Sequence, residues 1–275
     1  MPEGDTVWLT AHRLDQALRG RPVTRFDLRV PTLALADLRG TTVREVVSRG
    51  KHILMRFDDE RTLHSHLRMD GSWRIDRAAG SGTPPVGGRR RSDPRRAGQF
   101  TVRAVVGNAE WLASGHRVHD LDLAPSTQES RWVGHLGPDV LGSDWDPDTA
   151  AANLIRDPQR TVLEAMLDQR NLSGVGNMYA AEVLFMARTH PLTPAGSVAD
   201  VAALPAISFR LLRANRDHPE QSTTGDTRRG QQHWVYARSG QPCRRCRRPI
   251  VSAEFGAPPQ QRLTYWCPTC QPDLR

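Results

Sequence analysis

The stretch 167–185, LDQRNLSGVGNMYAAEVLF, joins the end of one helical pattern to the start of another through a turn that contains two glycines. The residues that lead into it, 154–170, have the apolar spacing of an amphipathic helix, and residues 172–187 pass from the glycine turn into a second helix. Two helices joined by a short glycine turn are typical of helix–turn–helix elements. With a third helix predicted over 198–216, the sequence predicts a helical domain over residues 125–218.

The residues before this domain predict one helix followed by a β-structure. Residues 5–19 have the apolar spacing of an amphipathic helix, for which Asp5 or Thr6 is the expected N-cap. Short segments of alternating polarity or rich in β-branched residues follow, separated by turn residues, at 23–30, 41–47, 52–57, 62–67 and 99–106. We therefore expect an N-terminal β-sandwich with a leading helix over residues 1–124, and an α+β, multi-domain chain.

Two segments without periodicity are expected to be loops. Residues 78–98 are rich in Gly, Pro and Arg, and their five arginines suit either contact with a phosphate backbone or a solvated surface position. Residues 219–242 are polar and predict a flexible loop before the C-terminal module.

All four cysteines lie near the C-terminus in a C-x2-C-x20-C-x2-C pattern, at Cys243, Cys246, Cys267 and Cys270. Two such pairs supply the four soft ligands of tetrahedral zinc, and four thiolates indicate a closed structural site rather than a catalytic one. The sequence therefore predicts one structural Zn²⁺ that clamps a β-hairpin over residues 243–271. The many arginines of this module favour contact with nucleic acid, although some such modules bind protein.

The composition favours a polyanionic partner. The chain has 38 Lys and Arg against 30 Asp and Glu, a net charge of +8 and a pI near 10.3. Such a balance favours nucleic acid before a membrane surface, and the arginine drift of a GC-rich genome is the alternative source of the charge. The sequence has no run of about 18 apolar residues and no basic n-region at its start, so we expect neither a membrane span nor a signal peptide, and a cytoplasmic location.

Lys51 and the amino terminus are the candidate sites of covalent chemistry. Lys51 is the only lysine among the 38 basic residues, and an arginine cannot usefully release a proton, so its retention indicates a need for a compact ammonium; chance retention is the alternative. Removal of Met1 would expose the secondary amine of Pro2, which can attack an aldehyde-level carbon and form a cationic iminium. Glu3 beside it is suited to act as a general acid.

Five motifs occur together in one order along the chain: PEG at 2–4, RGKHIL at 49–54, HLRMDGSW at 66–73, the helix–turn–helix stretch at 167–185, and QRLTYWC at 261–267 within the cysteine module. This combination resembles the formamidopyrimidine-DNA glycosylase and endonuclease VIII family of base-excision repair enzymes, from Pro2 to about Gln271. The resemblance implies an N-terminal β-sandwich, a helix–two-turn–helix domain and a zinc finger hairpin, with damaged DNA in the cleft between them.

The resemblance also implies a bifunctional DNA glycosylase and AP lyase. Pro2 matches the nucleophile that attacks C1′ of the damaged nucleotide and forms the iminium, and Glu3 matches the acid that protonates the sugar. Lys51 matches a lysine that contacts phosphate and assists proton transfer in β-elimination. Arg262 matches the arginine that grips phosphate at the flipped nucleotide and is linked to δ-elimination.

Some of the family's DNA-binding residues have clear counterparts in this sequence, and others have only loose ones. Asn177, in GVGN, matches a phosphate-binding asparagine, which we expect the N–H groups at the following helix start to assist. Met69, with Arg68 beside it on an expected loop tip, matches the wedge that fills the space of a flipped nucleotide. Arg117 is a loose counterpart of a second wedge residue, and His135 stands where the endonuclease VIII branch often has a DNA-contacting arginine.

The branch of the family that the chain resembles indicates which damaged bases it should remove. The segment ASGHRVHDLDL (113–123) lacks the phenylalanine wedge of the formamidopyrimidine branch, and GHLGPDVL (134–141) and the RGK form also favour endonuclease VIII, which prefers oxidised pyrimidines. The methionine wedge favours the alternative, oxidised purines such as 8-oxoguanine and formamidopyrimidine; a non-catalytic zinc-ribbon DNA-binding protein is the alternative from another class. We expect a monomer that acts on duplex, single-stranded or bubble DNA near the bacterial nucleoid.

Overall fold

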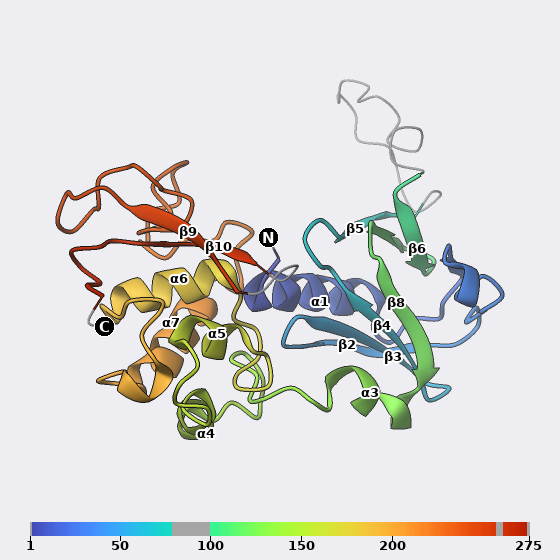
Figure 1. The fold of residues 1–275 in the computed structure, drawn as a ribbon. Coiled ribbons are helices and arrows are strands. Elements are labelled where there is room, and N and C mark those ends of the chain that lie inside the picture. The colour runs from blue at the N-terminus through green and yellow to red at the C-terminus, as the bar shows by residue number, and fades with distance from the viewer. Residues whose placement is uncertain (1, 79–99, 257–260, 274–275) are drawn as a thin grey trace, which may run out of the picture. The chain divides into compact units, whose positions relative to one another are not determined.

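The structure is a computed structural model that describes residues 2–78, 100–256 and 261–273 (Figure 1). These residues form two compact units. The first holds residues 7–134 together with Pro2, and the second holds residues 3–6 together with the remainder of the described chain. Most of the arginine-rich segment expected as a loop at 78–98 lies outside the described residues.

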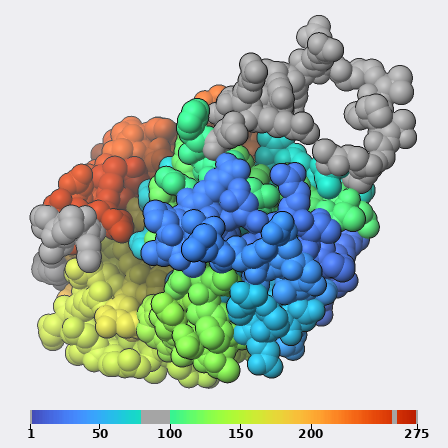
Figure 2. All heavy atoms as spheres, turned by 90° about the vertical axis from the view of Figure 1, so that its right-hand side faces the viewer, coloured from blue at the N-terminus to red at the C-terminus, as the bar shows by residue number. Residues whose placement is uncertain are grey.

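The first unit is a β-sandwich of two four-stranded antiparallel sheets. One sheet has the strand order β1-β6-β7-β5, formed by Arg25–Leu28, Val102–Gly107, Trp111–His116 and Ser72–Arg77. The other has the order β2-β3-β4-β8, formed by Val43–Arg49, His52–Phe57, Arg61–His66 and Asp120–Pro125. Figure 2 shows the blue and cyan surface of this unit, with the undescribed residues in grey.

The core of the sandwich explains the alternation seen in the strands. Apolar residues of both sheets and of helix α1 (Gly4–Leu18) form one buried cluster, which includes Leu14, Leu28, Phe57, Leu63 and Val106. Burying this apolar area provides the main driving force for the unit to fold. The predicted β-sandwich with a leading helix is confirmed.

Three strands and one cap depart from the sequence prediction. β5, β7 and β8 were not predicted, because charged residues and glycine interrupt their apolar pattern. Helix α1 begins at Gly4, so Asp5 lies within its first turn and not at the expected N-cap. The Asp5 carboxylate instead accepts hydrogen bonds from Tyr179 and Gln221.

The second unit begins later than expected. The boundary between the units falls after Gly134 rather than after residue 124. The short helices η2 (Ser126–Gln128) and α3 (Ser130–Val133) belong to the first unit, because Trp132 is buried against Leu54 and stacks on His64.

The helices of the second unit are α4 (Pro147–Leu154), α5 (Val162–Leu167), α6 (Asn177–Met186), η3 (Ala195–Ser197) and α7 (Ala203–Asn215). The single helix predicted over 154–170 is wrong: α4 ends at Leu154, and Pro158 lies in the connection before α5. Pro158 cannot supply a backbone N–H to a continuous helix. The glycine turn and the helix that follows it are confirmed, and every residue of α6 except Met186 is buried.

The C-terminal hairpin pairs β9 (Val251–Phe255) with β10 (Arg262–Trp266) in an antiparallel register. The expected zinc-finger hairpin is therefore present beside the helices of the second unit. Within the described ranges, no helix has the length and apolar character that crossing a bilayer requires.

Candidate active site

Glu3 caps the amino end of helix α6. Its carboxylate accepts hydrogen bonds from the backbone N–H groups of Gly176 (2.7 Å), Met178 (2.8 Å) and Tyr179 (3.3 Å). Gly176, the N-cap residue, has no side chain to satisfy these donors, so Glu3 does so from a distant part of the chain. The side chain is completely buried, and both the N–H donors and the positive end of the helix dipole stabilise its charge.

This contact corrects one expectation from the sequence. We expected the N–H groups at the start of α6 to assist phosphate binding by Asn177, but those of Met178 and Tyr179 are donated to Glu3. The helix terminus therefore fixes a carboxylate of the protein itself.

Two glycines allow the amino-terminal segment to approach the turn before α6. The N–H of Gly4 donates to the carbonyl oxygen of Gly174 at 2.9 Å. A Cβ on Gly4 would lie 2.9 Å from the Cα of Gly174, closer than side chains tolerate. Gly174 also has a φ of +102°, which only glycine adopts without strain. The PEG and SGVG motifs thus hold Glu3 in place together.

A second buried carboxylate follows Glu3. Asp5 accepts a hydrogen bond from the Tyr179 hydroxyl at 2.7 Å and from the side-chain amide of Gln221 at 2.8 Å. Burial raises the pKa of Asp5, against the lowering effect of the Tyr179 hydrogen bond. Burial, followed by the charge of Asp5, also raises the pKa of Tyr179, so the tyrosine remains a neutral donor. Sequence reasoning did not identify this pair.

Asn177 and the finger hairpin lie together in the second unit. The Asn177 side-chain amide donates to the carbonyl oxygen of Leu263 at 2.8 Å, directly after Arg262 in β10. The other amide atom, Oδ1 of Asn177, is buried without a hydrogen-bond partner, and so is the hydroxyl of Thr264. Arg262 is exposed, and within the described part of the chain its guanidinium donates to the backbone carbonyl of Gln261 at 3.2 Å. Polar groups that remain unpaired here suit a polar ligand.

Glu182 ties the segment before the finger to α6. This completely buried carboxylate accepts the backbone N–H groups of Trp234, Val235 and Tyr236, each at 2.8 Å, and the hydroxyl of Thr223. The segment 219–242 has no helix or strand, but it is held by these bonds, which the predicted flexible loop did not anticipate. An acid within the apolar run MYAAEVLFM was the signal that could have identified Glu182.

Lys51 occupies a tight turn in the first unit. Gly50 and Lys51 join β2 to β3, and Gly50 has a φ of +57°. Glycine with positive φ at the first of two loop positions is typical of a type II′ hairpin. The turn therefore presents Lys51 at one end of the β2-β3-β4-β8 sheet.

Three histidines lie beside this turn on β3 and β4. His52 Nδ1 lies 2.8 Å from His64 Nε2, and the ring of His52 packs edge-on against His66. Burial lowers the pKa of His64 to about 4, with a further lowering by His52. Burial, then the charge of Arg68 and more weakly that of Lys51, lowers the pKa of His66 to about 4. Both rings are therefore neutral near pH 7.

The predicted wedge lies on the same end of the sandwich. Met69 is 66% exposed in the turn between β4 and β5, as the sequence predicted for a loop tip. On one side of it, Arg68 donates to Asp120 at 2.5 Å; on the other, Arg117 lies 3.9 Å from the Asp70 carboxylate. The first unit thus brings the loops of Met69 and Arg117 together.

Two other predicted residues belong to different units: Pro2 is grouped with the first unit and His135 with the second. His135 is exposed at the start of the second unit. Pro2 is partly buried and directly precedes Glu3 in the chain.

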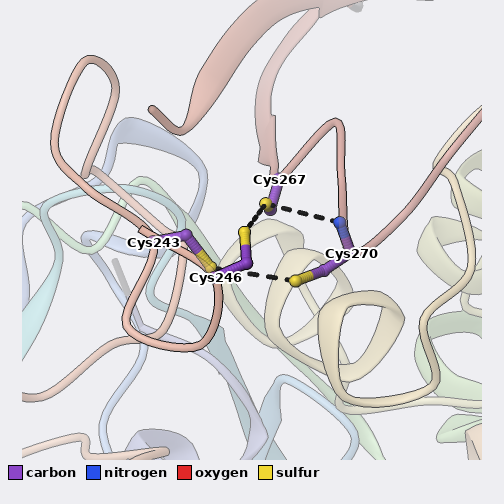
Figure 3. Close-up of side chains that lie close together, drawn as sticks. All are labelled: Cys243, Cys246, Cys267 and Cys270. Atoms are coloured by element: carbon purple, nitrogen blue, oxygen red, sulfur yellow. Dashed lines mark hydrogen bonds between the residues drawn. The ribbon is translucent and has the colours of Figure 1, made fainter. Parts of the chain in front are cut away.

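The four cysteines meet in one cluster (Figure 3). The sulfurs of Cys243, Cys246, Cys267 and Cys270 all lie within 4.8 Å of one another. Cys246 and Cys267 approach to 3.3 Å, and Cys243 and Cys270 to 4.0 Å. Four thiols this close fit a tetrahedral ion, so these residues hold one structural Zn²⁺ that fixes the hairpin.

Family models match each of the three modules. The formamidopyrimidine-DNA glycosylase N-terminal domain matches residues 1–119, the formamidopyrimidine-DNA glycosylase H2TH domain matches 136–207, and the zinc finger found in FPG and IleRS matches 240–272. A β-sandwich, an H2TH domain and a four-cysteine finger in this order define the class of zinc-finger DNA glycosylases. The chain belongs to the formamidopyrimidine-DNA glycosylase and endonuclease VIII family.

Similar curated proteins extend over nearly the whole chain. It is 48% identical to a probable endonuclease 8 2 of Streptomyces coelicolor, over 98% of this chain and 94% of that one. It is 42% identical to the DNA-(apurinic or apyrimidinic site) lyase Nei2 of Mycolicibacterium smegmatis, over 98% and 99%. A formamidopyrimidine-DNA glycosylase of Alkalilimnicola ehrlichii is 31% identical, over 98% and 100%.

The solved structures confirm the fold. Formamidopyrimidine-DNA glycosylase of Lactococcus lactis, determined in complex with DNA containing an AP site, aligns with a TM-score of 0.77. The alignment covers 99% of this chain and 100% of that one at 21% identity.

Proposed function

We propose that the protein is a bifunctional DNA glycosylase and AP lyase of base-excision repair, acting through the amine of Pro2. The observation that carries the proposal is the Glu3 carboxylate, buried and held by three N–H donors, directly after Pro2 in the chain. A carboxylate fixed this firmly beside a candidate secondary amine is preorganised for acid–base work. Relatives named endonuclease 8 and AP lyase support the same activity.

The reaction needs both residues. The Pro2 nitrogen attacks C1′ of the damaged nucleotide, the bond from C1′ to the base breaks, and the base leaves with a proton from solvent. Glu3 is stabilised as a carboxylate, so it takes the proton of the Pro2 ammonium and passes it to the ring oxygen of the sugar. The sugar ring opens, and an iminium remains between Pro2 and C1′.

Strand cleavage follows from the iminium. As an electron sink it acidifies the proton on C2′; loss of that proton expels the 3′ phosphate by β-elimination, and a second elimination expels the 5′ phosphate. We assign Lys51 to proton transfer and phosphate contact in the first elimination, and Arg262 to phosphate contact in the second. Asn177 binds phosphate through its amide.

The exposed residues of the first unit serve nucleotide flipping. Met69 inserts into the base stack where the damaged nucleotide leaves it, with Arg68 beside it in the same turn and Arg117 on the neighbouring loop. His135 contacts the DNA backbone. A monomer suffices for these roles, and its place of action is the nucleoid of the bacterial cytoplasm.

We further propose oxidised pyrimidines as the preferred lesions, supported by the greater identity to relatives named endonuclease 8 2 or Nei2, at 42% to 48%, than to relatives named formamidopyrimidine-DNA glycosylase, at 31% to 35%. The test is incision of matched oligonucleotides that carry thymine glycol, dihydrouracil, 5-hydroxycytosine or 8-oxoguanine, as duplexes, bubbles and single strands. Faster incision of the three pyrimidine lesions is expected. Preference for 8-oxoguanine would overturn the lesion assignment, and no incision of any substrate, including abasic DNA, would overturn the enzyme assignment.

A further inference from the structure

The segment 221–236, which we call the pre-finger loop, runs beside the amino-terminal residues of the second unit. At its start, the Gln221 amide donates to both carboxylate oxygens of Asp5, at 2.8 and 3.0 Å. At its end, burial and then the negative charge of Glu3 raise the pKa of Tyr236. The pre-finger loop is therefore bonded to Asp5 at its start and feels the charge of Glu3 at its end.

Hydrogen bonds hold this loop in one conformation. Glu182 accepts three consecutive N–H groups at its end, and the N–H of Thr223 donates to the carbonyl of Gln232 at 2.8 Å. From the finger, Arg244 donates to the carbonyl oxygens of Gly230 (2.7 Å) and His233 (3.0 Å). A loop fixed from two sides presents its side chains with little freedom to move.

His233 is the side chain in this loop whose bonding is incomplete. Its Nε2 atom is buried and has no hydrogen-bond partner, although its backbone is held by Arg244. Its ring packs edge-on against Tyr236, with centroids 5.5 Å apart. A buried polar atom without a partner costs free energy that a ligand can recover, so the position favours a ligand that bonds to Nε2.

The charges around His233 indicate which kind of ligand fits. Burial lowers the pKa of His233, the charge of Glu182 opposes that effect, and Arg238 and Arg244 add to it. The ring is therefore neutral near pH 7 and offers one donor or one acceptor at Nε2. A neutral imidazole suits the uncharged hydrogen-bonding edge of a base better than a phosphate, for which the arginines are suited.

We propose that His233 is a specificity-determining residue that hydrogen-bonds through Nε2 to the flipped, oxidised base. The proposal rests on the proposed glycosylase function and deepens it. A site built to bond a polar group discriminates strongly against bases that lack it, because Nε2 is then left buried and unpaired.

The test separates base recognition from strand cleavage. The His233→Leu and His233→Gln variants are compared with wild type on a thymine-glycol duplex and on the same duplex with a preformed abasic site, which has no base to bind. His218→Leu, an exposed histidine of the same unit, is the matched control. We expect His233→Leu to lower kcat/KM for thymine glycol about tenfold or more, His233→Gln to recover part of it, and abasic incision to stay within about twofold of wild type.

Three outcomes overturn the proposal. Equal losses on both substrates would show that His233 only supports the fold, and unchanged incision of thymine glycol and of the other lesions would show that it does not contact the base. Wild-type protein that cuts abasic DNA but no base lesion would also remove His233's role while leaving the lyase intact. Wild-type protein that cuts neither substrate would instead refute the proposed function.

Discussion

The two units hold their candidate residues in opposite ways. In the second unit, Glu3, Asp5 and Glu182 are buried carboxylates, each with two or more hydrogen-bond donors from distant parts of the chain. In the first unit, Lys51 and Met69 lie on turns, and the ion pairs beside Met69 are exposed. Buried hydrogen bonds fix the carboxylates of the second unit, whereas the candidate residues of the first unit lie on turns. The two regions should therefore tolerate substitution very differently.

The largest effect is expected from Glu3→Gln. Glutamine keeps an oxygen that accepts N–H groups of α6, but it cannot take the proton of the Pro2 ammonium, so iminium formation and strand cleavage should slow by about 10²- to 10⁴-fold while the protein remains folded. Single-turnover kinetics on a lesion duplex measure the loss, and thermal melting checks the fold. Asp5→Asn, at the neighbouring buried carboxylate, is the control and should lose much less activity. Equal losses in both variants would contradict a specific role for Glu3.

The second effect concerns stability. Glu182→Ala leaves the N–H groups of Trp234, Val235 and Tyr236 buried without an acceptor, at a cost of about 3–5 kcal/mol. Glu164→Ala removes a partner of the Thr161 hydroxyl at the start of α5 and should cost about 1 kcal/mol. Chemical denaturation of both variants measures the difference. Similar losses of unfolding free energy in the two variants would mean that the buried hydrogen bonds of Glu182 stabilise the protein no more than the helix cap at Thr161.

The third effect concerns the pH dependence of stability, which the buried histidine His64, beside the turn of Lys51, should set in part. His64 has its pKa lowered to about 4 by burial, against 6.5 as the ordinary value. Below pH 6.5, His64 binds a proton in the unfolded chain but stays neutral in the folded protein. The free energy of unfolding should therefore fall by about 3 kcal/mol as the pH falls to 4. Denaturation across this range is compared with His64→Leu, which should lose less stability as the pH falls, although His66, whose pKa is also lowered to about 4 by burial, remains to contribute. An unchanged pH dependence in the variant would exclude His64 as the cause.

The smallest effect is expected at the exposed ion pairs. Asp120→Ala removes the carboxylate that Arg68 contacts, and the change in stability should be within about 1 kcal/mol. Met69→Ala should also leave the melting temperature nearly unchanged, while weakening binding to a duplex with an abasic analogue, as measured by fluorescence anisotropy. A large loss of stability in either variant would show that this end of the sandwich is not the tolerant region.

The sequence predicted what depends on local pattern and missed what depends on distant contacts. The cysteine spacing predicted the cluster, and the glycine turn predicted helix α6. The partners of Glu3 could not be predicted, because the N–H groups it accepts lie more than 170 residues away. The break between α4 and α5 was missed although Pro158 signalled it, because apolar spacing continued across the proline.

The most direct test of the account is reductive trapping on the Pro2 amine. Wild-type protein is incubated with a thymine-glycol duplex and borohydride, and the adduct is digested and analysed by mass spectrometry. We expect a covalent adduct with DNA attached to residue 2, and none with Pro2→Gly. Attachment to Lys51 or any other residue, or an adduct that persists undiminished in the Pro2→Gly variant, would contradict it.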